Sequence, residues 1–377
     1  MVTKLFLAIA SLFATPQDPK TEIVWKEAVE FGRLIERDQA EGREAAFDAL
    51  FDLEGLVEES SAGLELTAAD KADIVKGART SSLGKSIGVA AGNSYRFLRA
   101  REVDGRWVLT FRLWADGVNY HDLRIKRTPA GLRIADLLVY MSGDWLGPTL
   151  RRSLMMVAAS TPGRRAKLPA AAGDWRAHWR QVQEFGREAA QGAPEKALAI
   201  FEGFPDSIKK DRSLQTLRLR ASAKIGGEAH DKAVDEYARQ FPGDGCRDIA
   251  CLDGLILRKD FAKALEAVDR IHKAVGGDHM LDIVRGRLHL MDGKLAPARE
   301  SALLALKNLP AIPDSHALII EVTLKEKKHA ETVERLEAME KALNIKVQSS
   351  TLESDPAYGD FLRSPEGILW LKMRSGK

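Results

Sequence analysis

Five side chains that support acid–base chemistry occur between residues 118 and 141, where polar and apolar residues alternate. They are Tyr120, His121, Asp122, Asp136 and Tyr140. A carboxylate or an imidazole in an apolar cavity acts as a general base, and a hydroxyl group stabilises the oxyanion that forms. Alternation along a strand puts His121 on the face of Leu123. It puts Asp122 on the opposite face with Tyr120 and Arg124, so His121 is the candidate that points into a pocket.

The same residues also have a purely structural interpretation. His121 then belongs to the core or its rim, Asp122 pairs with Arg124 or another cation, and Asp136 bonds the backbone at the sheet edge. No paired acid–base spacing, nucleophile elbow, phosphate-binding glycine loop or metal-ligand cluster accompanies them in the sequence. We therefore favour the structural interpretation, and we expect no catalytic residue, no cofactor and no metal.

The segment that carries these side chains follows three predicted helices. Apolar residues keep helical spacing in residues 20–82, and Thr67 with Asp70 forms a capping box at the start of the third helix. The period then changes to two. Asp104-Gly105 separates two alternating runs, which predicts a β-hairpin. Further strands are predicted at 118–126 and 132–141, and a helix at 148–159 follows them.

Helices followed by a meander of strands indicate an α+β domain. With the segments Trp107-Val-Leu-Thr-Phe-Arg and Arg133-Ile-Ala-Asp, the order of elements over residues 22–157 resembles the nuclear-transport-factor-like cone of ketosteroid isomerase and its relatives. The resemblance implies a cone-like domain with helices on the concave face of a bent sheet. It also implies the alternative function of this chain, a small-molecule-binding protein or an isomerase- or dehydratase-type enzyme that uses a pocket in the cone.

A second pattern spans residues 174–344. A small residue early on a second helix is followed four places later by an aromatic or apolar residue, and the small residues lie 36, 31, 34 and 34 positions apart: Ala197, Ala233, Ala264, Ala298 and Thr332. A period near 34 with this spacing resembles tetratricopeptide repeats. The expected pairs are 174–190 with 194–204, 212–225 with 229–241, 247–259 with 261–275, 279–292 with 295–308, and 314–326 with 329–343.

In such a solenoid the first helix of each pair lines a concave surface. Registering the helices on their small residues places a polar row there, namely Ser222, Asp253, Arg287 and Glu321, with Arg218 in a neighbouring row. We expect a protein or peptide partner in this groove, with Arg218 and Arg287 gripping a carboxylate. Two alternatives stay open. The charges neutralise one another between repeats, or the N-terminal domain fills the groove.

The two cysteines, Cys246 and Cys251, have two interpretations. Two helical residues five apart have Cα atoms roughly 8–9 Å apart, which is beyond disulfide reach. Gly243-Asp-Gly245 marks a loop just before Cys246, however, and a bridge is possible if Cys246 belongs to that loop. The alternative is two buried thiols at a helix contact.

The chain begins with Lys4 and a ten-residue apolar run that ends at Ala14, followed by Thr15-Pro16. This pattern predicts a signal peptide over residues 1–14 and a periplasmic or secreted protein. The remaining expected parts are an α+β domain at 20–159, a linker at 160–173, the solenoid at 174–344 and a capping segment at 345–377. After cleavage of the signal no stable membrane insertion is expected.

Composition narrows the function further. The chain has 377 residues, 57 Lys and Arg against 54 Asp and Glu, and no basic run, which argues against nucleic acid as a partner. The sequence therefore favours an exported, non-enzymatic protein-interaction module. It does not identify the partner or the oligomeric state.

Overall fold

The structure is a computed structural model that describes residues 23–91, 94–114, 117–165, 168 and 173–375. The predicted signal peptide at 1–14 lies outside the described residues. Contacts divide the chain into two compact units, unit 1 up to Gly226 and unit 2 from Gly227 onward. No helix among the described residues is long and apolar enough to cross a membrane.

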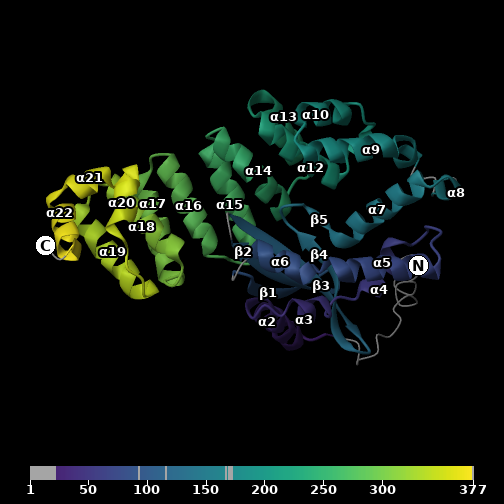
Figure 1. Ribbon diagram of the computed structural model, residues 1–377, viewed down its shortest axis with the longest axis horizontal. Coiled ribbons are helices and arrows are strands. Elements are labelled where there is room, and N and C mark those ends of the chain that lie inside the picture. The colour runs from purple at the N-terminus through teal and green to yellow at the C-terminus, as the bar shows by residue number, and fades with distance from the viewer. Residues whose placement is uncertain (1–22, 92–93, 115–116, 166–167, 169–172, 376–377) are drawn as a thin grey trace, which may run out of the picture. The chain divides into compact units, whose positions relative to one another are not determined.

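Unit 1 begins with helices and continues with a sheet (Figure 1). The helices are α2 (Trp25–Ala40), α3 (Glu44–Asp48), α4 (Leu53–Ser60), α5 (Ala68–Ser81) and α6 (Leu83–Ala91). The strands are β1 (Arg96–Val103), β2 (Arg106–Trp114), β3 (Val118–Thr128), β4 (Gly131–Val139) and β5 (Asp144–Trp145). After them come α7 (Leu146–Ser160), α8 (Pro162–Arg165), α9 (Gly173–Gln191), α10 (Pro194–Glu202), α11 (Asp206–Lys209) and α12 (Arg212–Ile225).

Local sequence signals account for most of these boundaries. Thr67 and Asp70 form the predicted capping box at the start of α5, with each side chain accepting a hydrogen bond from the other residue's backbone N–H. Asp104 and Gly105 both have positive φ between β1 and β2, as a tight hairpin turn requires. The predicted second helix is divided at Phe51 into α3 and α4, and α6 was not predicted.

The five strands form an antiparallel sheet in the order β1-β2-β3-β4-β5. One face of the sheet packs against α2 to α6, and this core contains Phe31, Phe47, Leu109, Phe111 and Leu123 among its buried side chains. Each strand hydrogen-bonds only to its sequence neighbours among the named strands. The structure thus shows helices and a small antiparallel sheet that precede a helical repeat region in the sequence, and the cone shape stays a prediction.

The contacts do not divide the chain at the predicted linker, residues 160–173. Leu168, within that segment, is buried in a cluster with Leu154 of α7 and Trp179 of α9. Arg152 of α7 forms an ion pair with Asp211, just before α12, at 3.3 Å. The first predicted helix pair is therefore packed into unit 1 by apolar contacts and a charge pair that linker composition did not reveal.

Among the described residues, unit 2 consists of α13 (Gly227–Gln240), the second helix of the second predicted pair, followed by three helix pairs and a short C-terminal segment. The paired helices are α14 (Gly245–Leu257), α15 (Phe261–Val275), α16 (Met280–Met291), α17 (Leu295–Asn308), α18 (Pro313–Lys325) and α19 (His329–Leu343). The segment that follows contains α20 (Ser349–Ser354), a 3₁₀ turn (Pro356–Tyr358), α21 (Gly359–Arg363) and α22 (Pro365–Ser375). The helices match the predicted pairs to within a few residues.

The 34-residue period recurs in the backbone of unit 2. The turn from the first to the second helix of each pair passes through Lys259, Gly293 and Lys327, all with positive φ. Two of these are lysines, for which a left-handed backbone is unfavourable. Five residues after each of these turns comes the small residue of the repeat. These small residues, Ala264, Ala298 and Thr332, are fully buried. We conclude that this part of the chain is tetratricopeptide-like.

Small residues lie where helices of unit 2 approach closely. A Cβ atom added at Gly286 would lie 2.5 Å from Leu318 Cδ2, so at this contact of α16 with α18 a side chain would displace Leu318. The C-terminal segment covers the last pair, because Leu352, Phe361 and Trp370 share a buried cluster with Ile320 and Leu336. This matches the predicted cap.

Ala298 tests the register of the repeat. Ala298→Leu should lower the free energy of unfolding by about 1–3 kcal/mol, because the position is fully buried and the larger side chain overpacks the contact. Ala296→Leu, on the exposed face of the same helix, is the matched control. Urea unfolding followed by circular dichroism measures both, and equal stability of the two variants would show that the register is wrong.

Candidate functional site

The first helices of the pairs in unit 2 present a set of equivalent side chains at a spacing of 34 residues. We call this set the strip: Asp253 and Leu257 on α14, Arg287 and Met291 on α16, Glu321 and Lys325 on α18. Each helix contributes one residue to the predicted polar row and the residue four places later, which is one turn further along the same face. The strip contains three of the five predicted groove residues.

The polar row of the strip is mainly acidic. Arg287 is half-exposed and its guanidinium lies 2.8 Å from a carboxylate oxygen of Asp314, on the next first helix. Burial raises the pKa of Glu321, and the nearby carboxylates of Asp314 and Asp355 raise it further, whereas Arg287 opposes the shift. Asp253 is exposed. Arg287 is therefore engaged within unit 2, as the predicted alternative of internal neutralisation requires.

Beside the polar row, the strip exposes apolar surface. Leu257 is 69% exposed and Met291 is 58% exposed. Ile256, Leu290 and Leu324, which occupy equivalent positions one residue earlier, are partly buried. Large apolar side chains at equivalent positions of successive repeats form a row rather than isolated exposed residues. The strip therefore combines an apolar edge with a charged one.

The structure contradicts the predicted role of Arg218 and Ser222 in the groove. The Arg218 side chain is only 4% exposed, lies 3.2 Å from Glu202 and is positioned over the Phe201 ring. Ser222 is completely buried, and its hydroxyl donates to the carbonyl of Leu219 at 2.8 Å. Arg218 thus joins α12 to α10, whereas the hydrogen bond of Ser222 to Leu219 stays within α12. A row of residues that is predicted from the helical period alone does not show whether its side chains face the groove or the protein interior.

His121 lies on the helix-covered face of the sheet, as alternation predicts. It is buried, its Nδ1 atom is 3.3 Å from the Tyr95 hydroxyl, and the Tyr95 ring stacks on Phe111 in the core. Burial lowers the pKa of His121 to about 3. A neutral imidazole packed among apolar side chains is the core histidine of the structural interpretation.

Asp122 lies on the opposite face, among polar partners. Its carboxylate accepts hydrogen bonds from the Thr110 hydroxyl at 2.7 Å and the Tyr140 hydroxyl at 3.2 Å, and it pairs with Arg101. Burial raises its pKa, and Arg101 opposes that rise. The cation is thus Arg101 rather than Arg124. Each carboxylate oxygen already has a hydrogen-bond donor, so the group is not poised as a base.

The remaining candidates of this region divide between two places. The Tyr120 and Tyr140 rings meet edge to face on the side of Asp122. Asp136 accepts hydrogen bonds from the backbone N–H groups of Leu137 and Gly147, which confirms the predicted backbone role. Burial raises the pKa of Asp136. The sheet thus brings together Tyr120, Asp122 and Tyr140, but it separates them from His121.

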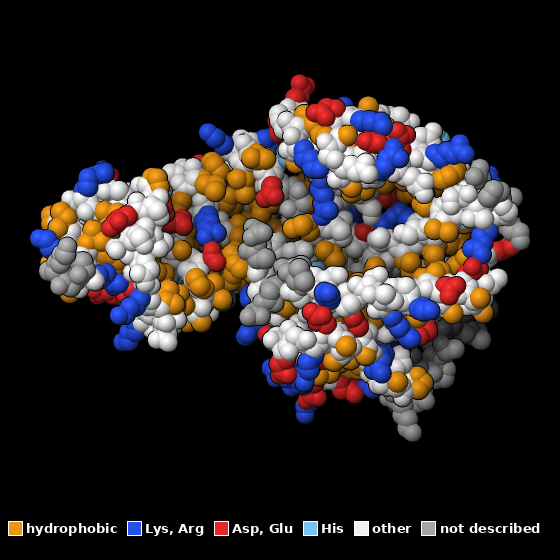
Figure 2. All heavy atoms as spheres, viewed as in Figure 1, with side chains coloured by type: hydrophobic (Ala, Val, Ile, Leu, Met, Phe, Trp, Pro, Cys, Tyr) orange, Lys and Arg blue, Asp and Glu red, His pale blue; other side chains and the backbone are white. Residues whose placement is uncertain are grey.

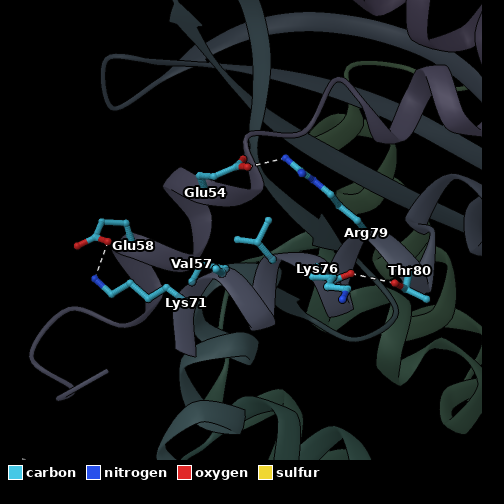
Figure 3. A pocket seen from close by; sticks show the side chains of 9 residues that line it. Glu54, Val57, Glu58, Lys71, Lys76, Arg79 and Thr80 are labelled. Carbon is cyan, nitrogen blue, oxygen red and sulfur yellow. Dashed lines mark hydrogen bonds and ion pairs between the residues drawn. The ribbon is translucent and has the colours of Figure 1, made fainter. Parts of the chain in front are cut away.

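Two surface cavities of unit 1, each of about 610 Å³, lie elsewhere than the predicted pocket. One is a groove between α4 and α5, shown in Figure 3, whose lining includes Val57 and Val75. Ion pairs between these two helices, Glu58 with Lys71 and Glu54 with Arg79, close its ends. The other includes Asp136 and Trp107 but none of the remaining four candidates.

The cysteines are two buried thiols, and the conditional disulfide is wrong. α14 begins at Gly245, so Cys246 and Cys251 both lie in the helix, and neither forms a disulfide. Burial raises the pKa of Cys251 to about 12, which keeps the thiol protonated. Within the described ranges no group of three or more His, Cys, Asp or Glu residues is arranged to hold a metal ion.

Comparisons with known proteins give fold likenesses only. No family model matches the chain, and no curated protein matches it. A point mutant of MamA is similar over 43% of this chain and 97% of its own, with 16% identity and a TM-score of 0.33. TTC0263, a tetratricopeptide protein of Thermus thermophilus, is similar over 48% of this chain and 98% of its own, with 14% identity and a TM-score of 0.31. At these scores the likenesses carry no argument, and the repeat assignment rests on the period within unit 2.

Sequence reasoning missed Leu257, Met291, Lys325 and Asp314. The first three lie one helical turn beyond the polar row, so the same 34-residue register would have found them. Asp314 lies in the first turn of α18 and reaches Arg287 because consecutive first helices are neighbours. Only the packed arrangement shows this pairing.

His121 makes the stability of unit 1 depend on pH. Its folded pKa lies below the ordinary value of 6.5, so folding favours the neutral form. The contribution is complete above that value and is lost as the pH falls from 6.5 toward 3. At about pH 5 the loss should be about 2 kcal/mol, at 1.4 kcal/mol per pH unit.

Urea unfolding followed by tryptophan fluorescence measures this effect. Six of the seven tryptophans belong to unit 1 and only Trp370 to unit 2, so the signal reports mainly on unit 1. The decrease in unfolding free energy from about pH 7.5 to about pH 5 should be smaller in His121→Gln by about 2 kcal/mol. Identical pH dependence in the two proteins would contradict a neutral, buried His121.

Proposed function

We propose that unit 2 captures a segment of a partner protein on the strip. The observation that carries the proposal is the exposure of Leu257 and Met291 at equivalent positions of successive repeats, next to a charged row. Exposed apolar rows bordered by polar residues are typical of protein-interaction surfaces. The close contact of Gly286 with Leu318 fixes the spacing between α16 and α18, which supports a rigid surface.

The energetics favour a modest affinity that depends on few residues. Covering an exposed Leu or Met side chain contributes about 1.5–3 kcal/mol. The charged row adds specificity more than affinity, since exposed ion pairs contribute little. Leu257 and Met291 should therefore supply most of the binding free energy, and the charges should select the partner.

Binding at the strip of unit 2 is better supported than catalysis by the candidate residues of unit 1. The Asp122 carboxylate is engaged by Thr110, Tyr140 and Arg101, and His121 is packed in the core on the other face. No observation favours the isomerase- or dehydratase-type alternative. Over the face shown in Figure 2, cationic and anionic side chains are interspersed, which is consistent with a protein rather than a nucleic-acid partner.

Peptides selected from a random library on the full-length protein test the role of the strip. Their affinity should fall by at least tenfold in the double variant Leu257→Ser, Met291→Ser, because the apolar edge is lost. Leu303→Ser, Leu304→Ser is the control, since these side chains on α17 are also large, apolar and exposed, at 41% and 43%. Selected peptides that bind all three proteins equally would refute capture at the strip.

We also propose that the protein is exported to the periplasm or beyond. Lys4, the apolar run from Leu5 to Ala14 and the following Thr15-Pro16 support this proposal. Residues 1–19 fused to alkaline phosphatase should direct the reporter into the periplasm of a bacterial host, with processing near Ala14. A Lys4→Glu fusion should be exported less efficiently. A wild-type fusion that stays in the cytoplasm with Met1 intact would refute export.

A further inference from the structure

The charges around the strip are distributed differently from the arginine clamp that the sequence predicted. Arg218 is buried in unit 1 and pairs with the exposed Glu202, and Arg287 already pairs with Asp314. The remaining carboxylates of the row, Asp253 and Glu321, form no ion pair or hydrogen bond with any residue that the structure describes. The groups available to a partner in this row are therefore anions.

Glu321 is the more informative of the two carboxylates. It is partly buried on α18, between Arg287 and the C-terminal segment that carries Asp355 and Tyr358. Its pKa is raised by burial and by the neighbouring carboxylates of Asp314 and Asp355. A partly desolvated anion beside other anions is stabilised by an added cation. No second anion would be accommodated there without cost.

The charges near Glu321 are also mainly negative. Glu321, Asp314 and Asp355 are three carboxylates against the two cations Arg287 and Lys325, and Asp253 adds a further exposed carboxylate to the polar row. Opposite charge on a partner speeds encounter and disfavours the wrong partner. Leu257 and Met291 require apolar side chains on that partner as well, and a thioether adapts readily to different apolar shapes.

We propose that the partner segment captured at the strip is basic and amphipathic, an inference that rests on the proposed function. Its Lys or Arg side chains face Asp253 and Glu321, and its apolar side chains cover Leu257 and Met291. This is the reverse of the carboxylate-bearing partner that Arg218 and Arg287 suggested from the sequence.

Two fluorescein-labelled peptides of equal length test the inference on the full-length protein by fluorescence anisotropy. One alternates Lys with Leu and the other alternates Glu with Leu, so that they differ only in charge. The Lys–Leu peptide should bind about tenfold more tightly, and its advantage should decrease as salt is added. In Asp253→Asn, Glu321→Gln most of this advantage should disappear.

The matched control for charge is Glu334→Gln, Glu337→Gln, which removes the same two charges from exposed positions on α19. It should keep the preference for the Lys–Leu peptide, and a loss equal to that of the strip variant would show nonspecific attraction and overturn the inference. Equal or tighter binding of the Glu–Leu peptide overturns it too. If either peptide binds and Leu257→Ser, Met291→Ser weakens that binding, the proposed function survives such a result. If no binding depends on Leu257 and Met291, the proposed function fails, and the inference fails with it.

Discussion

The close packing of one helix pair on the next is the constraint on which the surface of unit 2 depends. A Cβ at Gly286 would displace the Leu318 side chain, and Ala298 is fully buried. The turns at Lys259, Gly293 and Lys327 adopt the same left-handed backbone at intervals of 34 residues. Because each pair repeats the geometry of the last, residues 34 apart have equivalent environments. The strip exists for this reason, since three helices present the same two positions to the same side.

A different constraint organises unit 1, where a sheet must satisfy two unlike faces. One face buries apolar side chains against α2 to α6, and His121 remains neutral there because burial lowers its pKa. The other face carries Asp122 with Thr110, Tyr140 and Arg101, so that a buried carboxylate is compensated by hydrogen bonds and a cation. The same alternation that suggested a catalytic histidine and carboxylate keeps them apart. In a strand, side chains adjacent in sequence point to opposite faces of the sheet, and only alternate side chains share a face.

At the candidate site the repeat period predicted which positions are equivalent, but not which side chains are exposed. The register on Ala264, Ala298 and Thr332 placed Asp253, Arg287 and Glu321 correctly on equivalent first-helix positions. It failed at Ser222, which occupies the corresponding position of α12, and at Arg218 in the neighbouring row, since both side chains are buried. The difference is that unit 1 extends to Gly226 and packs α12 with α7, α9 and α10. Exposure is a property of what surrounds a helix, and the helical period contains no information on its surroundings.

The sequence by itself determined most helices and strands, although not α6 or the division of α3 from α4. It also determined the hairpin at Asp104-Gly105, the capping box at Thr67 and the helix pairs with their 34-residue register. These features depend on interactions within a few residues, or on small side chains whose spacing is visible in the sequence. Only the tertiary structure decided which charges are free to meet a partner. Arg287 forms an ion pair with Asp314, and Asp122 forms one with Arg101. The helices α9 to α12 pack within unit 1, together with the N-terminal half of the chain. Such pairings join residues distant in sequence, and many alternative pairs have equal charge, so that composition and period do not distinguish them until the backbone brings one pair within about 3 Å.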